Sequence, residues 1–403
     1  MGVPQQIQVK ADYVRILVAA GASLLGDGVR TAALPLLAAA LSPTPAAVGI
    51  VTFAGTVPIL LFTLLGGALA DRHDRRTIMW RIDVVRAVLV GGFAVWVLTT
   101  VPPLWALAAT TFLLGTAGTV FDSFASSFIA DLFGPDPAQL AWANSRFQAV
   151  QVISVQFLGP PLGAALFAVS AGAPLVVDAA SFAAGGILVF AIRARHAPVR
   201  PDRTATVLAD IAEGLRWLWR QHSLRLLAFE LGLATLTLQM GTVMLVLLIV
   251  TVLHGPVAIY GVVLLAGGVG GLLGSLAAGR VRRHLRPRAG LGLSIGLIAA
   301  GLLLVGFAWS IPVVAVGYGV GAFGTVLWNV QEVVIRQRLI PRALMGRATS
   351  AYRLIGWGGG PVGAAMGGVL GTVLGVRAPI IIGGALLALS LVLVPRLAAL
   401  ESA

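Results

Sequence analysis

The chain has 403 residues, of which 58% are hydrophobic and only 11% are charged, and its mean hydropathy is +0.96. Soluble domains are usually about 25% charged, so this composition excludes an ordinary water-soluble protein and indicates one that lies in a bilayer. The net charge of +13 raises the question of nucleic-acid binding, and the absence of cysteine excludes disulfides, thiolate metal sites and a cysteine nucleophile.

Twelve apolar stretches follow one another along the chain, each near the roughly 20 residues that a membrane-spanning helix needs. In the first half they cover 14–40, 46–69, 77–99, 103–130, 139–168 and 174–192, and in the second half 223–252, 256–279, 289–309, 312–338, 343–370 and 378–395. The predicted fold class is therefore an all-α membrane protein with twelve transmembrane helices.

The longest polar segment, 193–222, separates the first six stretches from the last six. Within it, 207–220 places apolar side chains near helical spacing and ends in Trp and Arg, which is typical of an amphipathic helix at a membrane surface. We expect this helix to act as a tether, with a regulatory role as the alternative. The predicted domains are an N-terminal six-helix bundle over 1–193, a cytoplasmic linker over 194–222 and a C-terminal six-helix bundle over 223–403.

Basic residues gather in every second loop. If the N-terminus is cytoplasmic, the outer loops 41–45, 100–104, 169–173, 253–257, 310–311 and 371–377 contain only two basic residues, Arg377 and His254. Because positive side chains remain on the cytoplasmic side, this pattern predicts a multi-pass protein of the inner or plasma membrane with both termini cytoplasmic. It also accounts for the basic charge without nucleic acid.

The two halves share short segments about half a chain apart. Gly66–Arg72 is similar to Gly274–Arg280, and Gly159–Gly163 is similar to Gly359–Gly363. Two similar halves around a central path are typical of transporters. Gly159 with Pro160, and Gly360 with Pro361, are candidate hinges, since proline removes a helical hydrogen bond; close helix packing is the alternative.

The loop between the second and third predicted helices reads Gly-Ala-Leu-Ala-Asp-Arg-His-Asp-Arg-Arg over 67–76. It resembles the signature loop of the major facilitator superfamily at Gly67, Asp71, Arg72, Arg75 and Arg76, and it differs at Asp74, where the family more often has Gly. Segments 25–28, 141–145, 159–163, 178–182, 213–216 and 345–348 resemble the branch that holds macrolide-efflux and siderophore-export proteins, which are drug:proton antiporters. The resemblance implies two six-helix bundles that expose a central site alternately to each side.

This loop is also a candidate gate. Asp71 could accept hydrogen bonds from the N-terminus of the eleventh helix, near Leu344, and Arg75 could pair with Asp131 at the end of the fourth. We expect both contacts only when the inner gate is closed, and the resemblance implies that they stabilise the outward-open state. The alternative is that these residues only set topology and solvate the loop.

Ionisable residues at membrane depth are costly and suggest functional sites. Asp27 and Arg30 lie one turn apart in the first helix, and Asp122, Glu230 and Glu332 lie in the fourth, seventh and tenth, which the resemblance implies line the cavity. Burial disfavours a charged carboxylate, so such a group can take up a proton near neutral pH. Asp27 is our first candidate for proton coupling. Neutral candidates for the cavity wall are Gln148, Gln151, Gln156, Gln239 and Asn329.

Structural roles compete with these assignments. Asp27 and Arg30 could be an ion pair that only joins helices, and Glu332 could pair with Arg336. Asp178 could simply cap the sixth helix. A further possible cluster joins Asp122 to the residues Asp83, Arg86 and Arg146.

The predicted function is export of a small amphipathic organic compound, a drug or a secreted metabolite, in exchange for protons. We expect a monomer that uses the proton gradient, without a cofactor, a metal, nucleic acid or an enzymatic reaction; its partners would be the substrate, protons and the lipid bilayer. Two alternatives stay open. One is uptake or facilitated diffusion by the same fold, and the other is a membrane protein that handles lipid or acts like a receptor without transport.

Overall fold

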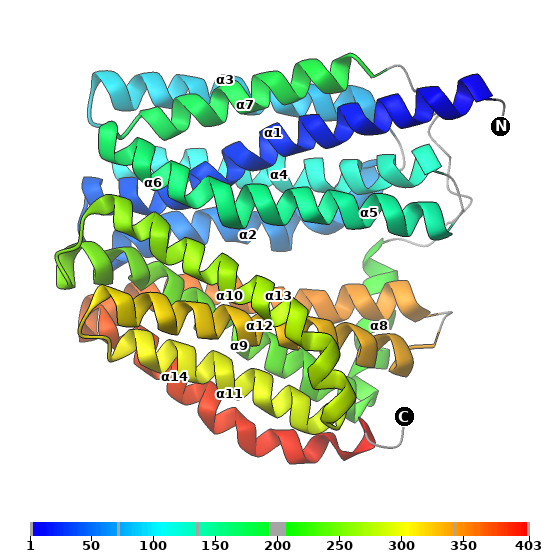
Figure 1. Ribbon diagram of the computed structural model, residues 1–403, viewed down its shortest axis with the longest axis vertical. Coiled ribbons are helices and arrows are strands. Elements are labelled where there is room, and N and C mark those ends of the chain that lie inside the picture. Colours follow the sequence, from blue (N-terminus) through cyan, green and yellow to red (C-terminus); the bar gives the residue numbers. More distant parts are fainter. Residues whose placement is uncertain (1–2, 71–72, 134–136, 193–206, 342–343, 401–403) are drawn as a thin grey trace. The chain divides into compact units, whose positions relative to one another are not determined.

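The structure, a computed structural model, describes residues 3–70, 73–133, 137–192, 207–341 and 344–400. These ranges are almost entirely helical and contain no strand (Figure 1). The first group of helices comprises α1 (Val3–Leu41), α2 (Pro45–Ala70), α3 (Arg75–Thr99), α4 (Leu104–Phe133), α5 (Pro137–Gln151), the π-helix η1 (Val152–Leu158), α6 (Gly159–Val169) and α7 (Ala173–Phe190).

The second group begins with α8 (Val207–Arg220), which covers the predicted amphipathic segment. After it come α9 (His222–Leu247), the π-helix η2 (Leu248–Val252), α10 (Val257–His284), α11 (Pro287–Gly306), α12 (Ile311–Leu339), α13 (Met345–Leu374), α14 (Arg377–Ser390) and the 3₁₀-helix η4 (Leu391–Leu400). The all-α fold class is confirmed.

Eleven helices in the described ranges are long and apolar enough to cross a membrane. The thirty-residue α13 is not among them, since its first turns carry polar and basic side chains and glycine fills much of its middle. The count of twelve and the orientation of the termini therefore stay predictions.

The fifth predicted helix is interrupted. A single helix over 139–168 was expected, but α5 passes into the π-helix η1 before α6 begins at Gly159. The backbone N–H of Gly159 donates to the carbonyl oxygen of Ser154, five residues earlier, which is the π-helical pattern. The two prolines that follow have no N–H to donate, so the regular ladder cannot continue through them.

Contacts between Cα atoms divide the chain into two units, Met1–Leu41 with Ala54–Arg203 and Ser42–Phe53 with Thr204–Ala403. In the first unit α1 packs against α6, η1 and α7, and α3 packs against α4 and α7. A cluster of buried apolar side chains, which includes Ile16, Met79, Phe124, Phe128 and Val189, joins α1, α3, α4 and α7. Close van der Waals packing of these side chains holds the four helices together.

Glycines let α1 approach its neighbours closely. A Cβ atom on Gly28 would lie 2.6 Å from the carbonyl oxygen of Ser154 and 3.0 Å from the Cα atom of Gly159. A Cβ atom on Gly163 would lie against the backbone of Val29. The packing role of Gly159 is thus visible, whereas the hinge role of Gly159 and Pro160 stays a prediction.

In the second unit α9 packs along α13, and α12 packs against α10 and α11. Close approaches again use glycine, because a Cβ atom on Gly363 would meet the backbone of Leu236. Gly360 has open space where its Cβ would be, and Pro361 is buried inside the continuous helix α13. This second candidate hinge also stays a prediction.

The linker helix α8 is docked on α13. Nη1 of Arg347 lies 2.8 Å from Oε2 of Glu213, and the carbonyl oxygen of Arg347 occupies the space that a side chain at Gly214 would need. Leu218 is fully buried. The contact joins two of the segments that resemble the export branch, 213–216 and 345–348, which lie far apart in the sequence.

Candidate functional site

Arg30 of α1 lies between two carboxylates in the first unit. One is Asp27, a helical turn earlier, and the other is Asp178 of α7, whose Oδ2 is 3.0 Å from Nη1 of Arg30. The Asp178 side chain is 0% exposed, whereas that of Asp27 is 24% exposed. The expected Asp27–Arg30 pair is present, and it is part of a larger ionic group.

The interpretation of Asp178 as a helix cap is wrong. The N-cap residue of α7 is Gly172, and Asp178 lies in the second turn of the helix. Its proximity to α1 depends on Gly26, where a Cβ atom would be only 2.5 Å from Oδ1 of Asp178 and would contact Oγ of Ser181. Glycine at this position therefore lets α7 bring its carboxylate to Arg30.

A second pair, on α3, lies beside the first. Nη1 of Arg86 is 3.7 Å from Oδ1 of the fully buried Asp83. The guanidinium group of Arg86 lies over the ring of Phe182 at 4.9 Å, and that of Arg30 lies over the same ring at 5.5 Å. Phe182 thus contacts both cations, and its π-face is a favourable neighbour for each.

Asp122 on α4 completes the group. Its side chain is exposed, and its carboxylate is attracted by Arg86 and repelled by Asp27. Arg146, expected in the same cluster, has its guanidinium group over the ring of Trp142 at 4.0 Å, and the charges that act on Asp122 are those of Arg86 and Asp27. We call Asp27, Arg30, Asp83, Arg86, Asp122 and Asp178 the charge cluster.

Several polar atoms in and beside the charge cluster are buried without a hydrogen-bond partner among the described residues. They are both carboxylate oxygens of Asp83, Oδ1 of Asp178, Nε of Arg86 and Oγ of Ser23. Ser23 and Asp83 both lie where a side chain at Gly185 would be. Buried polar groups normally find partners, and carboxylate oxygens are acceptors, so those of Asp83 and Asp178 could accept a proton or another donor.

The predicted acids of the second unit each have a partner inside that unit, although Oε1 of Glu230 and Oε1 of Glu332 are buried without a hydrogen bond to a described residue. Oγ of Ser390 donates to Oε2 of the buried Glu230 at 3.0 Å. Glu332 lies 3.4 Å from Nε of Arg336, whose guanidinium group lies over the ring of Tyr352. The expected Glu332–Arg336 pair is therefore present.

The neutral candidates differ in exposure. Gln239 is partly buried and Asn329 is exposed in the second unit. In the first unit Gln148, Gln151 and Gln156 are all exposed along α5 and η1. Polar side chains at membrane depth avoid lipid tails, so these exposures are compatible with surfaces that face water.

The candidate gating loop is described in part. Arg75 is paired with Asp131, as expected. Both residues lie in the first unit, so the contact joins α3 to α4 without a residue of the second unit, and the expectation that it forms only with a closed gate stays a prediction. Asp71 and Arg72 lie outside the described residues, and Gly67 lies in the last turns of α2.

Arg76 has a packing role. Its Nη2 donates to the carbonyl oxygen of Phe190, and its Nε donates to that of Val189 at 3.4 Å. These carbonyl groups belong to the last turn of α7, where a positive charge is favourable. The side chain therefore ties the start of α3 to the end of α7.

Sequence comparisons relate the chain to membrane exporters. The profile of the transmembrane secretion effector family matches residues 8–402. The multidrug efflux pump Tap of Mycolicibacterium fortuitum is 28% identical over 401 residues, which cover 96% of this chain and 97% of Tap. Tap of Mycobacterium tuberculosis is 26% identical over 383 residues, with 90% and 88% covered.

Solved structures share the fold at low sequence identity. A mutant of the nucleoside transporter NupG matches with a TM-score of 0.80 and 12% identity, over 96% of this chain and 99% of that one. A bacterial homologue of the iron transporter ferroportin matches with a TM-score of 0.74 and 17% identity, over 98% and 99%. These similarities show a common architecture and carry no information on the substrate.

Proposed function

Because the chain belongs to the transmembrane secretion effector family of the major facilitator superfamily, we propose that it exports a small amphipathic organic compound in exchange for protons. Family membership makes it a multi-pass membrane transporter. The relatives named as multidrug efflux pumps support the outward direction and an amphipathic substrate. The proposal includes twelve transmembrane helices, both termini in the cytoplasm, and a central site that faces each side in turn.

The charge balance of the cluster carries the proposal. Its four carboxylates, Asp27, Asp83, Asp122 and Asp178, face two guanidinium groups, so full ionisation leaves an excess of two negative charges. Negative charge without compensation is expensive at membrane depth. Protons or a cationic substrate would each neutralise the excess. Competition between the two for the same carboxylates would give obligatory exchange.

Exposure assigns different roles to the carboxylates. Asp27 and Asp122 are accessible, so we propose that they exchange protons and meet the positive end of the substrate. Asp178 is fully buried and holds Arg30, so it is a positioning residue. When Asp27 is neutralised, Arg30 keeps one carboxylate partner instead of two. Such a change in ion pairing can bias a two-state equilibrium between the inward-open and outward-open forms.

Reconstituted vesicles test the proposal. The full chain is placed in liposomes with an imposed pH gradient and an internal pH-sensitive dye, and a panel of cationic, neutral and anionic amphipathic compounds is added. We expect proton movement that depends on the compound and is strongest for cations. Transport that ignores the pH gradient would favour facilitated diffusion, and flux in the direction of the protons would favour uptake.

A further inference from the structure

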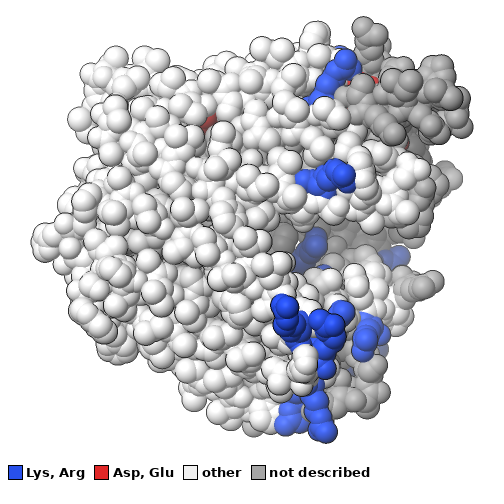
Figure 2. Space-filling model, in the orientation of Figure 1, with Lys and Arg blue, Asp and Glu red and all other residues white. Residues whose placement is uncertain are grey.

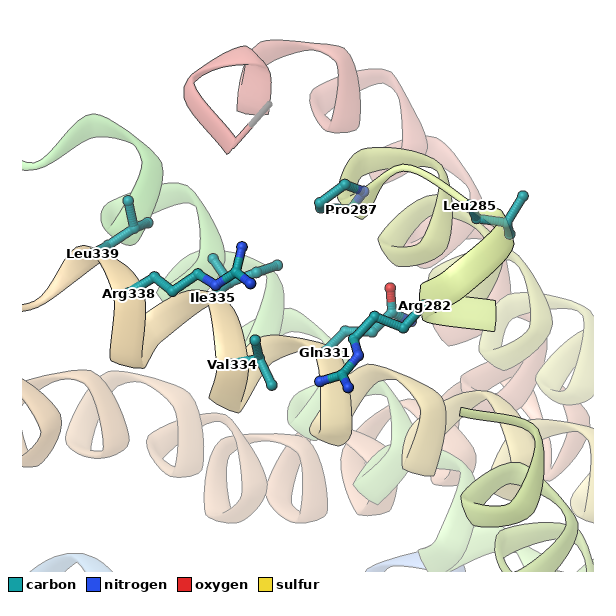
Figure 3. Close-up of a pocket in the computed structure, with 8 residues that line it drawn as sticks. All are labelled: Arg282, Leu285, Pro287, Gln331, Val334, Ile335, Arg338 and Leu339. Carbon is teal, nitrogen blue, oxygen red and sulfur yellow. The ribbon is translucent and has the colours of Figure 1, made fainter. Parts of the chain in front are cut away.

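A basic pocket lies in the second unit between the end of α10, the start of α11 and the last turns of α12 (Figure 3). Its volume is about 370 Å³, within the usual range for small-molecule sites. Arg282 of α10 and Arg338 of α12 line it together with Gln331 and the aliphatic side chains Leu285, Val334 and Ile335. These residues lie outside the charge cluster and outside the segments that resemble the export branch.

Within the part of the chain that the structure describes, the two arginines have no counter-ion. Both are exposed, and neither forms an ion pair or hydrogen bond with another described residue. They come from the last turns of two different helices. Figure 2 shows basic side chains gathered at this end of the second unit, with no acidic side chain visible among them. Two guanidinium groups at one pocket repel each other, and an anion between them would remove that repulsion.

Hydrogen bonds from Gln331 join two of the helices that line the pocket. Nε2 of Gln331 donates to the carbonyl oxygen of Gly290 at 3.2 Å and to Oγ of Ser294 at 3.0 Å. Gln331 therefore ties α12 to α11 at the base of the pocket. The guanidinium groups remain available for a ligand, and phosphate suits them because guanidinium can bind its oxygens in a bidentate manner.

The aliphatic part of the lining indicates an amphipathic anion. Leu285, Val334 and Ile335 offer nothing to a small hydrated ion, but they can cover an acyl chain or a glycerol backbone. The arginines lie in the last turns of α10 and α12, both of which are apolar enough to cross a membrane. Lipid headgroups occupy this depth, and basic pockets between helices at the membrane surface suit anionic lipids.

We propose that this pocket binds one anionic glycerophospholipid, with its phosphate between Arg282 and Arg338 and its chains against the aliphatic wall. The alternative is that these arginines serve only to orient the helices in the membrane. In the first case lipid binding depends on these two arginines in particular, and in the second it does not. Arg280 and Arg283 lie at the same end of α10 but do not line the pocket, so they supply a control with equal loss of charge.

Native mass spectrometry of the full chain tests this proposal. The protein is reconstituted in vesicles of equal parts phosphatidylglycerol and phosphatidylethanolamine, extracted in a non-ionic detergent, and its retained lipids are counted. We expect one tightly retained phosphatidylglycerol in the wild type, a loss of affinity of about tenfold or more in Arg282→Gln/Arg338→Gln, and near wild-type retention in Arg280→Gln/Arg283→Gln. Arg282→Lys/Arg338→Lys should fall between, because it keeps the charge but not the bidentate geometry.

Two results would overturn the proposal. In one, the two glutamine double variants lose lipid equally, or neither of them loses it. The arginines of the pocket would then act on lipid only through the general surface charge. In the other, an excess of inorganic phosphate displaces the phosphatidylglycerol as readily as added phosphatidylglycerol does, which makes the site one for free anions. The elution volume of each variant in size-exclusion chromatography shows whether it has folded. The lysine double variant keeps the charge at both positions and is the comparison for a glutamine variant that fails to fold.

Discussion

Arg30 is the residue through which the charge cluster joins two helices. Its partners are Asp27 on its own helix and Asp178 on α7, 148 positions away in the sequence. Spacing along α1 predicts the first partner, because residues three apart share a face. Nothing in the sequence indicates the second, since Asp178 near the start of an apolar stretch has the pattern of a cap.

The first prediction concerns Asp27. Asp27→Asn keeps the size of the side chain and a hydrogen-bond acceptor for Arg30, but it cannot bind or release a proton. We expect proton-driven transport to be abolished while downhill exchange of substrate between the two sides of a vesicle persists. Pumping by Asp27→Asn at the wild-type rate would remove this residue from the coupling mechanism.

The second prediction concerns Asp178. Asp178→Asn weakens a buried charge-assisted hydrogen bond, so we expect a loss of about 1.5–3 kcal/mol in the free energy of unfolding. The control, Glu213→Gln, removes a carboxylate from the exposed pair with Arg347 and should cost no more than about 1 kcal/mol. Denaturation in detergent micelles compares the two, and equal costs would contradict a buried structural role for Asp178.

Helix α1 owes its position to the absence of side chains at its contact points. At Gly26 and Gly28 the neighbouring helices occupy the space that a Cβ atom would need. The ion pair between Arg30 and Asp178 therefore depends on α1 and α7 lying this close. The close packing of α1 against α7 thus determines which charged side chains form an ion pair.

The third prediction compares two glycines. Gly26→Ala places a methyl group against Asp178 and Ser181, and we expect a loss of about 1–3 kcal/mol from overpacking. Gly92→Ala on α3 meets nothing within 4 Å, so it should gain up to about 1 kcal/mol from higher helix propensity. Relative to the wild type, the thermal unfolding midpoint should fall in Gly26→Ala and rise in Gly92→Ala. A shift of both midpoints in the same direction would contradict the packing role of Gly26.

The fourth prediction concerns the docking of α8. Gly214→Ala cannot be accommodated without moving the carbonyl oxygen of Arg347, so we expect α8 to separate from α13. Gly346→Ala, which has open space, is the control. Because the chain has no cysteine, Leu218→Cys supplies a single thiol that is buried in the docked form. Its labelling rate should rise with Gly214→Ala and stay unchanged with Gly346→Ala.

At the scale of the whole molecule, hydropathy and turn residues predict most of the architecture. The apolar stretches coincide with helices to within a few residues, apart from longer extensions at the ends of the chain and at α10, and α8 covers its predicted range. The π-helix η1 was not predictable, because periodicity does not distinguish a π-helical turn inside an apolar run. Ion pairs between residues far apart in the sequence, such as Arg30 with Asp178, were also not predictable. A single sequence contains no pattern that shows which distant charges are neighbours in the fold.

Competition between protons and substrate for the carboxylates of the charge cluster is the step on which the proposed exchange depends. Its most direct test measures, in wild-type vesicles, the protons that leave for each molecule of a transported cationic compound that enters, with and without a protonophore. If protons and substrate compete, we expect a fixed stoichiometry and the loss of uphill transport when the protonophore collapses the gradient. Uphill transport that continues after the collapse, or substrate flux with no accompanying proton movement, would contradict it.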